Sequence, residues 1–255
     1  MSVTIETDAR GVATLSLARP AKRNALDRAT IDALSEAAAR LGADPAVRVV
    51  VLAGEGEAFC AGGDLAWMRA QMDAGAEERA EGARALAGML GALDAMPRPL
   101  IGRIHGDAFG GGVGLACVCD VALAGRGARF GLTETRLGLI PATIGPYVIA
   151  RLGPKARRVF MAPRMIGAPE AADLGIVARV AGDLDAAVEE EVAPYLAAAP
   201  GAVAEAKALA RRLGGAPGAA EVEATVAALV ARWETEEARA GIAAFFDREP
   251  PPWAQ

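Results

Sequence analysis

Two glycine-rich turns and one isolated acid are the residues of this chain whose types suit chemistry on a ligand. The turns are residues 61–64 (AGGD) and 110–112 (GGG), and Glu134 follows the second of them. Because glycine has no Cβ, its backbone approaches a ligand closely with an unshielded N–H, so two such turns brought together can aim two donors at one oxygen. The pattern predicts an oxyanion hole. Glu134 nearby would supply the proton transfer that an enolate-forming reaction needs.

Composition limits the other classes of function. The chain has 255 residues, 53% of them hydrophobic, and a net charge of −5. It can bury a large core, and it lacks the basic footprint of a protein that binds nucleic acid or an anionic membrane. The N-terminus has no signal-peptide pattern, and no uncharged apolar stretch reaches the roughly 18 residues of a membrane span. We therefore expect a soluble, cytoplasmic protein with neither nucleic acid nor membrane as a partner.

Reactive side chains are scarce. Cys60, Cys117 and Cys119 are odd in number and lack C-x-x-C spacing, which argues against a disulfide framework and a zinc site. His105 is the single histidine and no G-x-S-x-G sequence occurs, so serine and zinc hydrolases are excluded and no metal site is expected. His105 is predicted to be a packed or pocket-lining residue, and Cys60 to pack beneath the first glycine turn.

The elements that must position these residues alternate between strands and helices. Strands are predicted at residues 3–7, 12–18, 49–52, 100–104, 121–124 and 128–130. Helices are predicted from about residue 27, over 77–95, and in a short buried segment that begins at the second glycine turn and ends near 120. The order strand, turn, helix recurs three times, which indicates an α/β core of repeated units, and both glycine turns follow buried strands.

The C-terminal part of the sequence has a helical pattern without strands. After about residue 184 the strand signals stop, and alanine-rich helical patterns cover 184–199, 201–213 and 219–240. We divide the chain into an α/β core over residues 1–190 and a helical C-terminal subdomain over 191–255. The alanine-rich faces of this subdomain suit a subunit interface, and no low-complexity linker separates it from the core.

Several segments in register resemble the enoyl-CoA hydratase/isomerase (crotonase) superfamily over nearly the whole chain. They are residues 19–26 (RPAKRNAL), 58–65 (AFCAGGDL), 110–112 (GGG), 130–134 (FGLTE) and 137–141 (LGLIP). The resemblance implies an α/β spiral of ββα units with a helical C-terminal trimerisation subdomain. It also implies a homotrimer or a dimer of trimers, and an acyl-CoA thioester substrate. Coenzyme A then enters as part of the substrate, and no separate cofactor is expected.

The resemblance also assigns roles to residues. The backbone N–H groups of Gly63 and Gly111 are expected to hold the thioester oxygen, and Glu134 matches the second catalytic glutamate of the family. The positions that match the coenzyme A groove are Arg19, Lys22, Asn24, Ala25, Leu26, Ala61, Asp64 and Leu65. Lys22 has a direct physical use beside phosphates. The acyl pocket is expected to be formed by residues 66–85, residues 130–147 and the tail of a neighbouring subunit.

One departure from the family leaves the reaction open. Hydratases of this family carry a first glutamate at the position of Gly114. Hydration needs water activated at C3 and a proton delivered to C2, so two carboxylates are the direct solution. Glu134 can perform both steps in turn, or a second acid can come from the substrate or from Glu57, Asp64 or Asp107. Shifting a double bond from C3 to C2 needs a single base, which favours an isomerase.

Three functions follow in order of preference. Residues 132–148 look like those of bacterial methylglutaconyl-CoA hydratase-like members, so a hydratase comes first, with a substrate of the 3-methylglutaconyl-CoA type. Arg136 or His105 would then meet a distal carboxylate. An isomerase with Glu134 as the sole base comes second, and a non-catalytic acyl-CoA-binding protein comes third. A nucleotide-binding protein is excluded because Leu115 breaks the G-x-G-x-x-G pattern.

Overall fold

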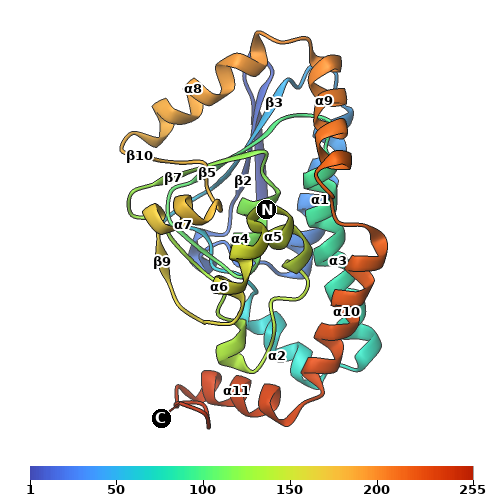
Figure 1. Cartoon of the computed structure of the whole chain (residues 1–255), viewed down its shortest axis with the longest axis vertical. Coiled ribbons are helices and arrows are strands. Elements are labelled where there is room, and N and C mark those ends of the chain that lie inside the picture. Colours follow the sequence, from blue (N-terminus) through green and yellow to red (C-terminus); the bar gives the residue numbers. More distant parts are fainter. Residues whose placement is uncertain (255) are drawn as a thin grey trace.

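A six-stranded sheet forms one half of the core, in the order β1-β2-β3-β5-β7-β10 (Figure 1). The structure is a computed structural model that describes residues 1–254. The first two strands form an antiparallel hairpin, and the remaining pairs are parallel. The strands are β1 (Val3–Thr7), β2 (Val12–Leu17), β3 (Val49–Gly54), β5 (Leu100–Ile104), β7 (Val121–Gly125) and β10 (Arg179–Ala181).

The sequence of strand β3 is an unbroken apolar run because both faces of the strand are buried. Val49 and Val51 pack toward helix α8 (Leu184–Leu196), whereas Val50 and Leu52 join the main core with helices α1 (Arg28–Ala43) and α3 (Ala76–Ala95). Side chains alternate between the faces of a strand, so a strand covered on both faces has no polar positions. The predicted burial of this strand on both faces is confirmed.

A second sheet of four short strands lies beside the first, in the order β4-β6-β8-β9. Its strands are β4 (Ala58–Cys60), β6 (Asp107–Phe109), β8 (Arg129–Gly131) and β9 (Ile166–Gly167). The first three are parallel to one another, and each directly follows a strand of the large sheet. Helical structure comes next in each case, namely α2 (Leu65–Asp73) with α3, α4 (Gly111–Val118), and η2 (Glu134–Leu137) with α5 (Gly145–Leu152).

The chain therefore winds through three ββα units, as the resemblance implied. Of the three-residue strands of the small sheet, β8 was predicted at 128–130 but β4 and β6 were missed, because three residues are too few for periodicity to be decisive. The two glycine turns follow these short strands, and not the longer β3 and β5 directly.

The C-terminal part is helical, as predicted, with one difference. Helices α8 and α9 (Pro200–Leu213) match expectation, but the predicted single helix over 219–240 is wrong, because it divides into α10 (Ala219–Trp233) and α11 (Glu236–Asp247). The Thr235 side chain accepts a hydrogen bond from the Ala238 N–H at 3.2 Å and so caps a new helix. Shorter helices are η1 (Pro20–Lys22), η3 (Gly153–Lys155), α6 (Ala156–Phe160) and α7 (Ala168–Leu174).

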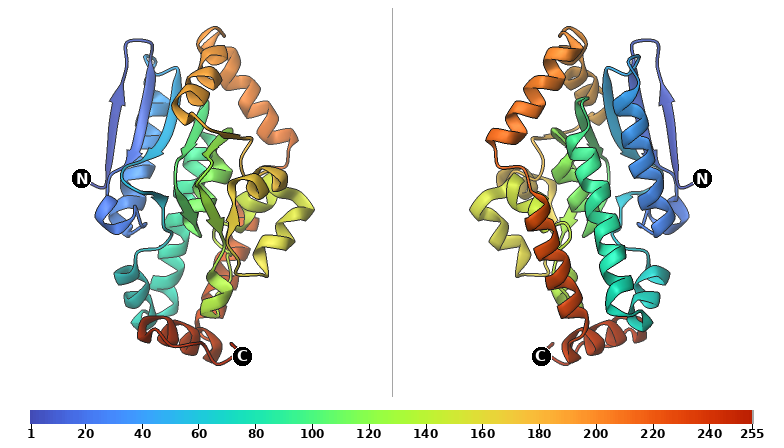
Figure 2. Two further views of the ribbon diagram at one scale, coloured as in Figure 1. Left: turned by 90° about the vertical axis from the view of Figure 1, so that its left-hand side faces the viewer. Right: turned by 90° about the vertical axis from the view of Figure 1, so that its right-hand side faces the viewer.

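The last two helices return to the core. Helix α10 packs along α3, and α11 crosses the lower end of the molecule against η2 (Figures 1 and 2). In the region the structure describes, no helix combines the length and apolarity needed to cross a bilayer.

Asn24 fixes the loop between β2 and α1 onto the strands. Its buried side chain donates hydrogen bonds to the carbonyl oxygens of Glu55 and Ala58, both at 2.8 Å, and accepts one from the Arg19 N–H at 2.9 Å. Its φ of 55° lies in the left-handed region, which asparagine tolerates better than most residues. One side chain therefore sets both the conformation and the position of this loop.

Replacing Asn24 by alanine should cost about 2–4 kcal/mol of unfolding free energy, since three buried hydrogen bonds are lost at about 1 kcal/mol each and left-handed backbone strain is added. Urea denaturation measures the change. Asn24→Gly should be less damaging because glycine removes the strain, and Lys22→Ala, at an exposed position of the same loop, should change stability by less than about 0.5 kcal/mol. An Asn24→Ala protein as stable as the unmodified one contradicts this role.

Candidate active site

Three parallel strands end side by side at one edge of the small sheet. Strand β4 leads into Gly62 and Gly63, β6 leads into Gly110 and Gly111, and β8 leads to Glu134. Because neighbouring parallel strands point their carboxyl ends the same way, the residues that follow them gather at one place. The register of the small sheet brings together the three groups that the sequence singled out.

The two glycine turns are in direct contact. A Cβ atom on Gly112 would lie only 2.4 Å from the carbonyl oxygen of Cys60, so no side chain fits between the start of α4 and the end of β4. Cys60 itself is fully buried, and burial raises the pKa of its thiol to about 12. The predicted packing of Cys60 beneath the turn is confirmed, and its thiol stays protonated.

Among residues 1–254, each turn offers a backbone N–H with no acceptor. Gly63 forms an isolated parallel bridge with Leu26, in which the bonds run from the Leu26 N–H to the Gly62 carbonyl and from the Asp64 N–H to the Leu26 carbonyl. In this pattern the N–H of Gly63 itself points away from its partner. Gly111 begins helix α4, where N–H groups have no intrahelical acceptor. Both residues line the same cavity, which is the arrangement that an oxyanion hole requires.

Glu134 lies against the second turn. Its Oε1 is close to Gly110, since a Cβ on that glycine would be 3.0 Å away, and its Oε2 is buried with no hydrogen-bond partner in residues 1–254. Burial raises the pKa of Glu134 to about 7, against the smaller opposing effect of the backbone N–H groups of Thr133 and Glu134. A carboxyl with a pKa near neutrality both accepts and returns a proton readily.

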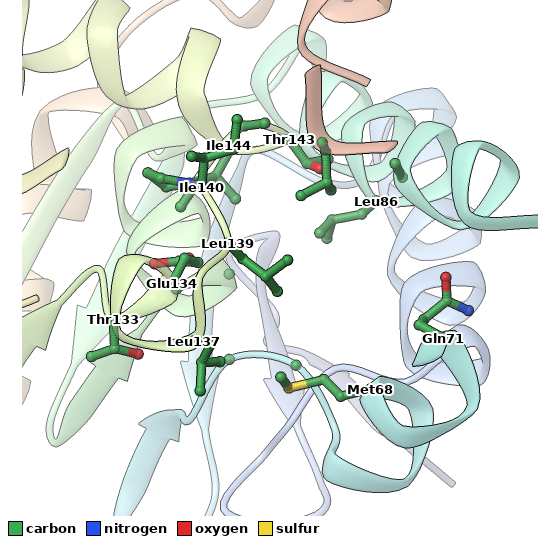
Figure 3. A pocket seen from close by; sticks show the side chains of 18 of the residues that line it. Met68, Gln71, Leu86, Thr133, Glu134, Leu137, Leu139, Ile140, Thr143 and Ile144 are labelled. Carbon is green, nitrogen blue, oxygen red and sulfur yellow. The ribbon is translucent and has the colours of Figure 1, made fainter. Parts of the chain in front are cut away.

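The cavity beside these groups has a volume of about 380 Å³ and mostly apolar walls (Figure 3). Its apolar lining includes Trp67, Met68, Leu86, Leu139, Ile144 and Trp233. The predicted contributions of residues 66–85 and 130–147 agree with this lining. Leu229, Trp233 and Phe245, from α10 and α11 of the same chain, also line the cavity, and the contribution of a neighbouring subunit's tail stays a prediction.

The place of the first family glutamate is filled by apolar side chains. A Cβ on Gly114 would lie 2.8 Å from Cγ2 of Ile144 and 3.4 Å from Cδ1 of Leu90. The prediction at Gly114 did not include Ile144, which is thirty positions further along and approaches Gly114 only through the packing of α4 on the segment before α5. A glutamate at this position therefore requires Ile144 to move.

None of the other predicted acids reaches the cavity. Asp64 caps α2 and forms an ion pair with Arg19 at 3.0 Å. Burial acts to raise its pKa, but the hydrogen bonds from the Ala66 N–H and from Arg19 hold the pKa below its usual range. Asp107 lies between Arg129 and Arg23, which lower its pKa, and Glu57 is exposed. Among residues 1–254, Glu134 is the only carboxylate that lines the cavity.

The residues predicted to bind coenzyme A fall into two groups. Ala61 and Leu65 line the cavity, and Lys22 is exposed on its loop. The others support the loop between β2 and α1: Arg19 pairs with Asp64, Asn24 makes the bonds described above, and Ala25 and Leu26 are buried. Their contact with coenzyme A stays a prediction.

The two residues predicted to contact a distal carboxylate of the substrate lie in different places. Arg136 lines the cavity, whereas His105 lies outside it and bonds through Nε2 to the carbonyl oxygen of Gly56 at 2.9 Å. Within residues 1–254, no group of three or more His, Cys, Asp or Glu side chains is placed to hold a metal ion.

This combination of fold and site matches one known family. The family model for enoyl-CoA hydratase/isomerase matches residues 7–255. The chain belongs to the enoyl-CoA hydratase/isomerase family. An enoyl-CoA hydratase from Mycobacterium avium, known from its crystal structure, is similar with a TM-score of 0.90 and 33% identity, covering 99% of each chain.

Two curated members of the family are also similar. A Thermus thermophilus protein provisionally named enoyl-CoA hydratase is 34% identical over 250 residues, which are 97% of this chain and 99% of that protein. The crotonyl-CoA hydratase of Syntrophomonas wolfei is 35% identical over 172 residues, which are 66% of this chain and 65% of that protein. Hydratase names therefore recur among the family members that this chain resembles.

Burial of Glu134 links folding to pH. The pKa of Glu134 is about 7 in the folded chain and near 4.5 in an unfolded one. Ionising the buried carboxyl therefore lowers the free energy of unfolding, and this loss is absent below pH 4.5 and complete above pH 7. Glu134→Gln should therefore be more stable than the unmodified protein at pH 8, by on the order of 2–3 kcal/mol, and equally stable near pH 4.5.

Urea denaturation between pH 4.5 and pH 8 measures this difference. The exposed Glu57→Gln variant is the matched control and should show no such pH-dependent gain. Equal stabilities of Glu134→Gln and the unmodified protein at pH 8 would mean that the Glu134 carboxyl is not destabilised by burial.

Proposed function

We propose that this protein is an enoyl-CoA hydratase that adds water to the double bond of a 2-enoyl-CoA with Glu134 as its only proton-transferring side chain. The observation that carries the proposal is the position of Glu134, whose buried carboxyl with a pKa of about 7 lies beside the two free glycine N–H groups. Several relatives with hydratase names, the crotonyl-CoA hydratase among them, support the choice of reaction.

The reaction balances with one carboxylate. Ionised Glu134 takes a proton from water as the water oxygen bonds to C3, and the π electrons of the double bond move to the thioester oxygen. The N–H groups of Gly63 and Gly111 stabilise the resulting enolate, an effect that in other enzymes is worth about 10²–10³ in rate per donor. Glu134 then returns its proton to C2, the enolate collapses to the thioester, and the net change is the addition of one water.

The acyl group is proposed from the resemblance of residues 132–148 to methylglutaconyl-CoA hydratase-like proteins, which suggests a substrate of the 3-methylglutaconyl-CoA type. We further propose that Lys22 and the groove residues named above hold coenzyme A. A homotrimer or dimer of trimers is proposed from the resemblance to the crotonase superfamily, and the cytoplasmic location stays an expectation from the sequence.

An isomerase is the second candidate, and the filled space at Gly114 favours it. Moving a double bond from C3 to C2 requires removal of a proton from C2 and its return at C4, and one carboxylate performs both steps. Because Ile144 and Leu90 leave no second acid in the cavity, the site contains all that this reaction needs. A protein that only binds acyl-CoA is the third candidate, and it has no physical use for a buried, destabilising acid.

Product mass separates these candidates. On incubation with crotonyl-CoA and 3-methylglutaconyl-CoA, we expect a mass gain of one water and loss of the ultraviolet absorbance of the conjugated enoyl thioester. A 3-enoyl-CoA that becomes conjugated at unchanged mass, without hydration of the 2-enoyl thioesters, supports the isomerase. Tight coenzyme A binding without any turnover supports the binding protein.

Glu134→Gln should lower the rate of turnover by about 10²–10⁴, because the amide cannot accept a proton from water. Steady-state kinetics with the best substrate of the product assay measure the loss, and Glu57→Gln, exposed and outside the cavity, is the control. Full activity in Glu134→Gln rejects Glu134 as the proton-transferring group.

The pH profile of kcat/KM should report the same group. Because the ionised form of Glu134 is required and its pKa is about 7, kcat/KM should fall about tenfold per pH unit below that value and level off above it. A profile that is flat between pH 5 and pH 8 contradicts this assignment.

A further inference from the structure

The wall of the cavity opposite Glu134 carries polar side chains that the proposed reaction does not use. Gln71 on α2 and Thr143 before α5 are 7% and 5% exposed, and both line the cavity (Figure 3). Within the part of the chain that the structure describes, neither side chain makes a hydrogen bond, and neither has its polar atoms sealed from the cavity. They therefore present unpaired hydrogen-bonding groups to whatever fills it.

These two groups oppose an all-alkyl ligand. A hydrocarbon chain packed against the Gln71 amide and the Thr143 hydroxyl displaces the water that binds them and provides no hydrogen bond to replace it. An unpaired buried polar group weakens binding by about tenfold or more. In a wall otherwise formed by Trp67, Leu86 and Leu139, two such groups indicate a ligand with a polar end.

Arginine side chains determine the charge of that polar end. Arg79 on α3 is nine-tenths buried and lines the cavity, with Nε donating to the Gln71 carbonyl at 2.9 Å and Nη2 to the Met72 carbonyl at 3.1 Å. Its Nη1 pairs with Glu234, which is half exposed, and a guanidinium has five N–H donors, so two remain. Arg136 also lines the cavity and makes no ion pair within residues 1–254.

We propose that Gln71 and Thr143, backed by the guanidinium of Arg79, form a subsite for a carboxylate at the far end of a short acyl chain. This inference rests on the proposed function in that the thioester end of the same ligand occupies the oxyanion site of Gly63 and Gly111. It replaces His105, which lies outside the cavity, as the partner of the distal group. The preferred substrates are then the monothioesters of short unsaturated dicarboxylic acids with coenzyme A.

The test uses ligands that cannot react. Glutaryl-CoA and pentanoyl-CoA are saturated thioesters of five-carbon acyl groups that differ at the far end by a carboxylate against a methyl group. Isothermal titration calorimetry gives the ratio of their Kd values. For the unmodified protein we expect glutaryl-CoA to bind at least tenfold more tightly than pentanoyl-CoA.

Near-isosteric variants identify the subsite. Thr143→Val and Gln71→Met should each reduce that preference about five- to tenfold, mainly by weakening glutaryl-CoA binding. Thr225→Val is the matched control, because this threonine on α10 bonds to the Val222 carbonyl and lies outside the cavity, and it should leave the ratio unchanged. Circular dichroism of each variant verifies folding.

The outcomes separate the two proposals. Pentanoyl-CoA bound as tightly as glutaryl-CoA, or a preference that Thr143→Val and Gln71→Met leave intact, overturns the carboxylate subsite even if crotonyl-CoA is hydrated. A glutaryl-CoA preference that both variants reduce supports the subsite even if no enoyl-CoA is hydrated, in which case the hydratase proposal alone fails.

Discussion

The contact between the start of α4 and the end of β4 is the constraint on which the site depends. At Gly112 the backbone lies so close to the Cys60 carbonyl that no side chain fits between them. This contact, together with the parallel pairing of β4, β6 and β8, sets the two free N–H groups and Glu134 around one cavity. The large sheet, the helices that cover it and the loop held by Asn24 keep those three short strands in register.

Glu134 is the only carboxylate among the described residues that line the cavity, and this shapes the chemistry. Ile144 and Leu90 close the space at Gly114, where hydratases of the family carry their first glutamate. Burial raises the pKa of Glu134 to about 7. A single group that exchanges protons in both directions is what a reaction of either candidate type requires.

The glycine turns and Glu134 were predictable from sequence because their chemistry lies in the backbone or in one conspicuous residue, and the buried strand β3 because its apolar run is continuous. The strands β4 and β6 were not, since three residues are too few for periodicity to be decisive, although β8 of the same length was predicted. Thr235 followed by two glutamates is a helix start that the alanine-rich pattern concealed. The approach of Ile144 to Gly114 and the polar wall at Gln71 and Thr143 arise only when distant segments pack, so no local pattern announces them.

Helices α10 and α11 line the acyl cavity of their own chain, and this arrangement separates two tasks along the sequence. The turns and Glu134, to which the proposed thioester chemistry is assigned, lie before residue 135, whereas Leu229, Trp233 and Phe245 line the cavity from a contiguous terminal segment. The separation is not complete, because α11 packs against η2, and η2 begins with Glu134. A substitution in residues 219–247 that reshapes the cavity therefore also acts on the position of Glu134.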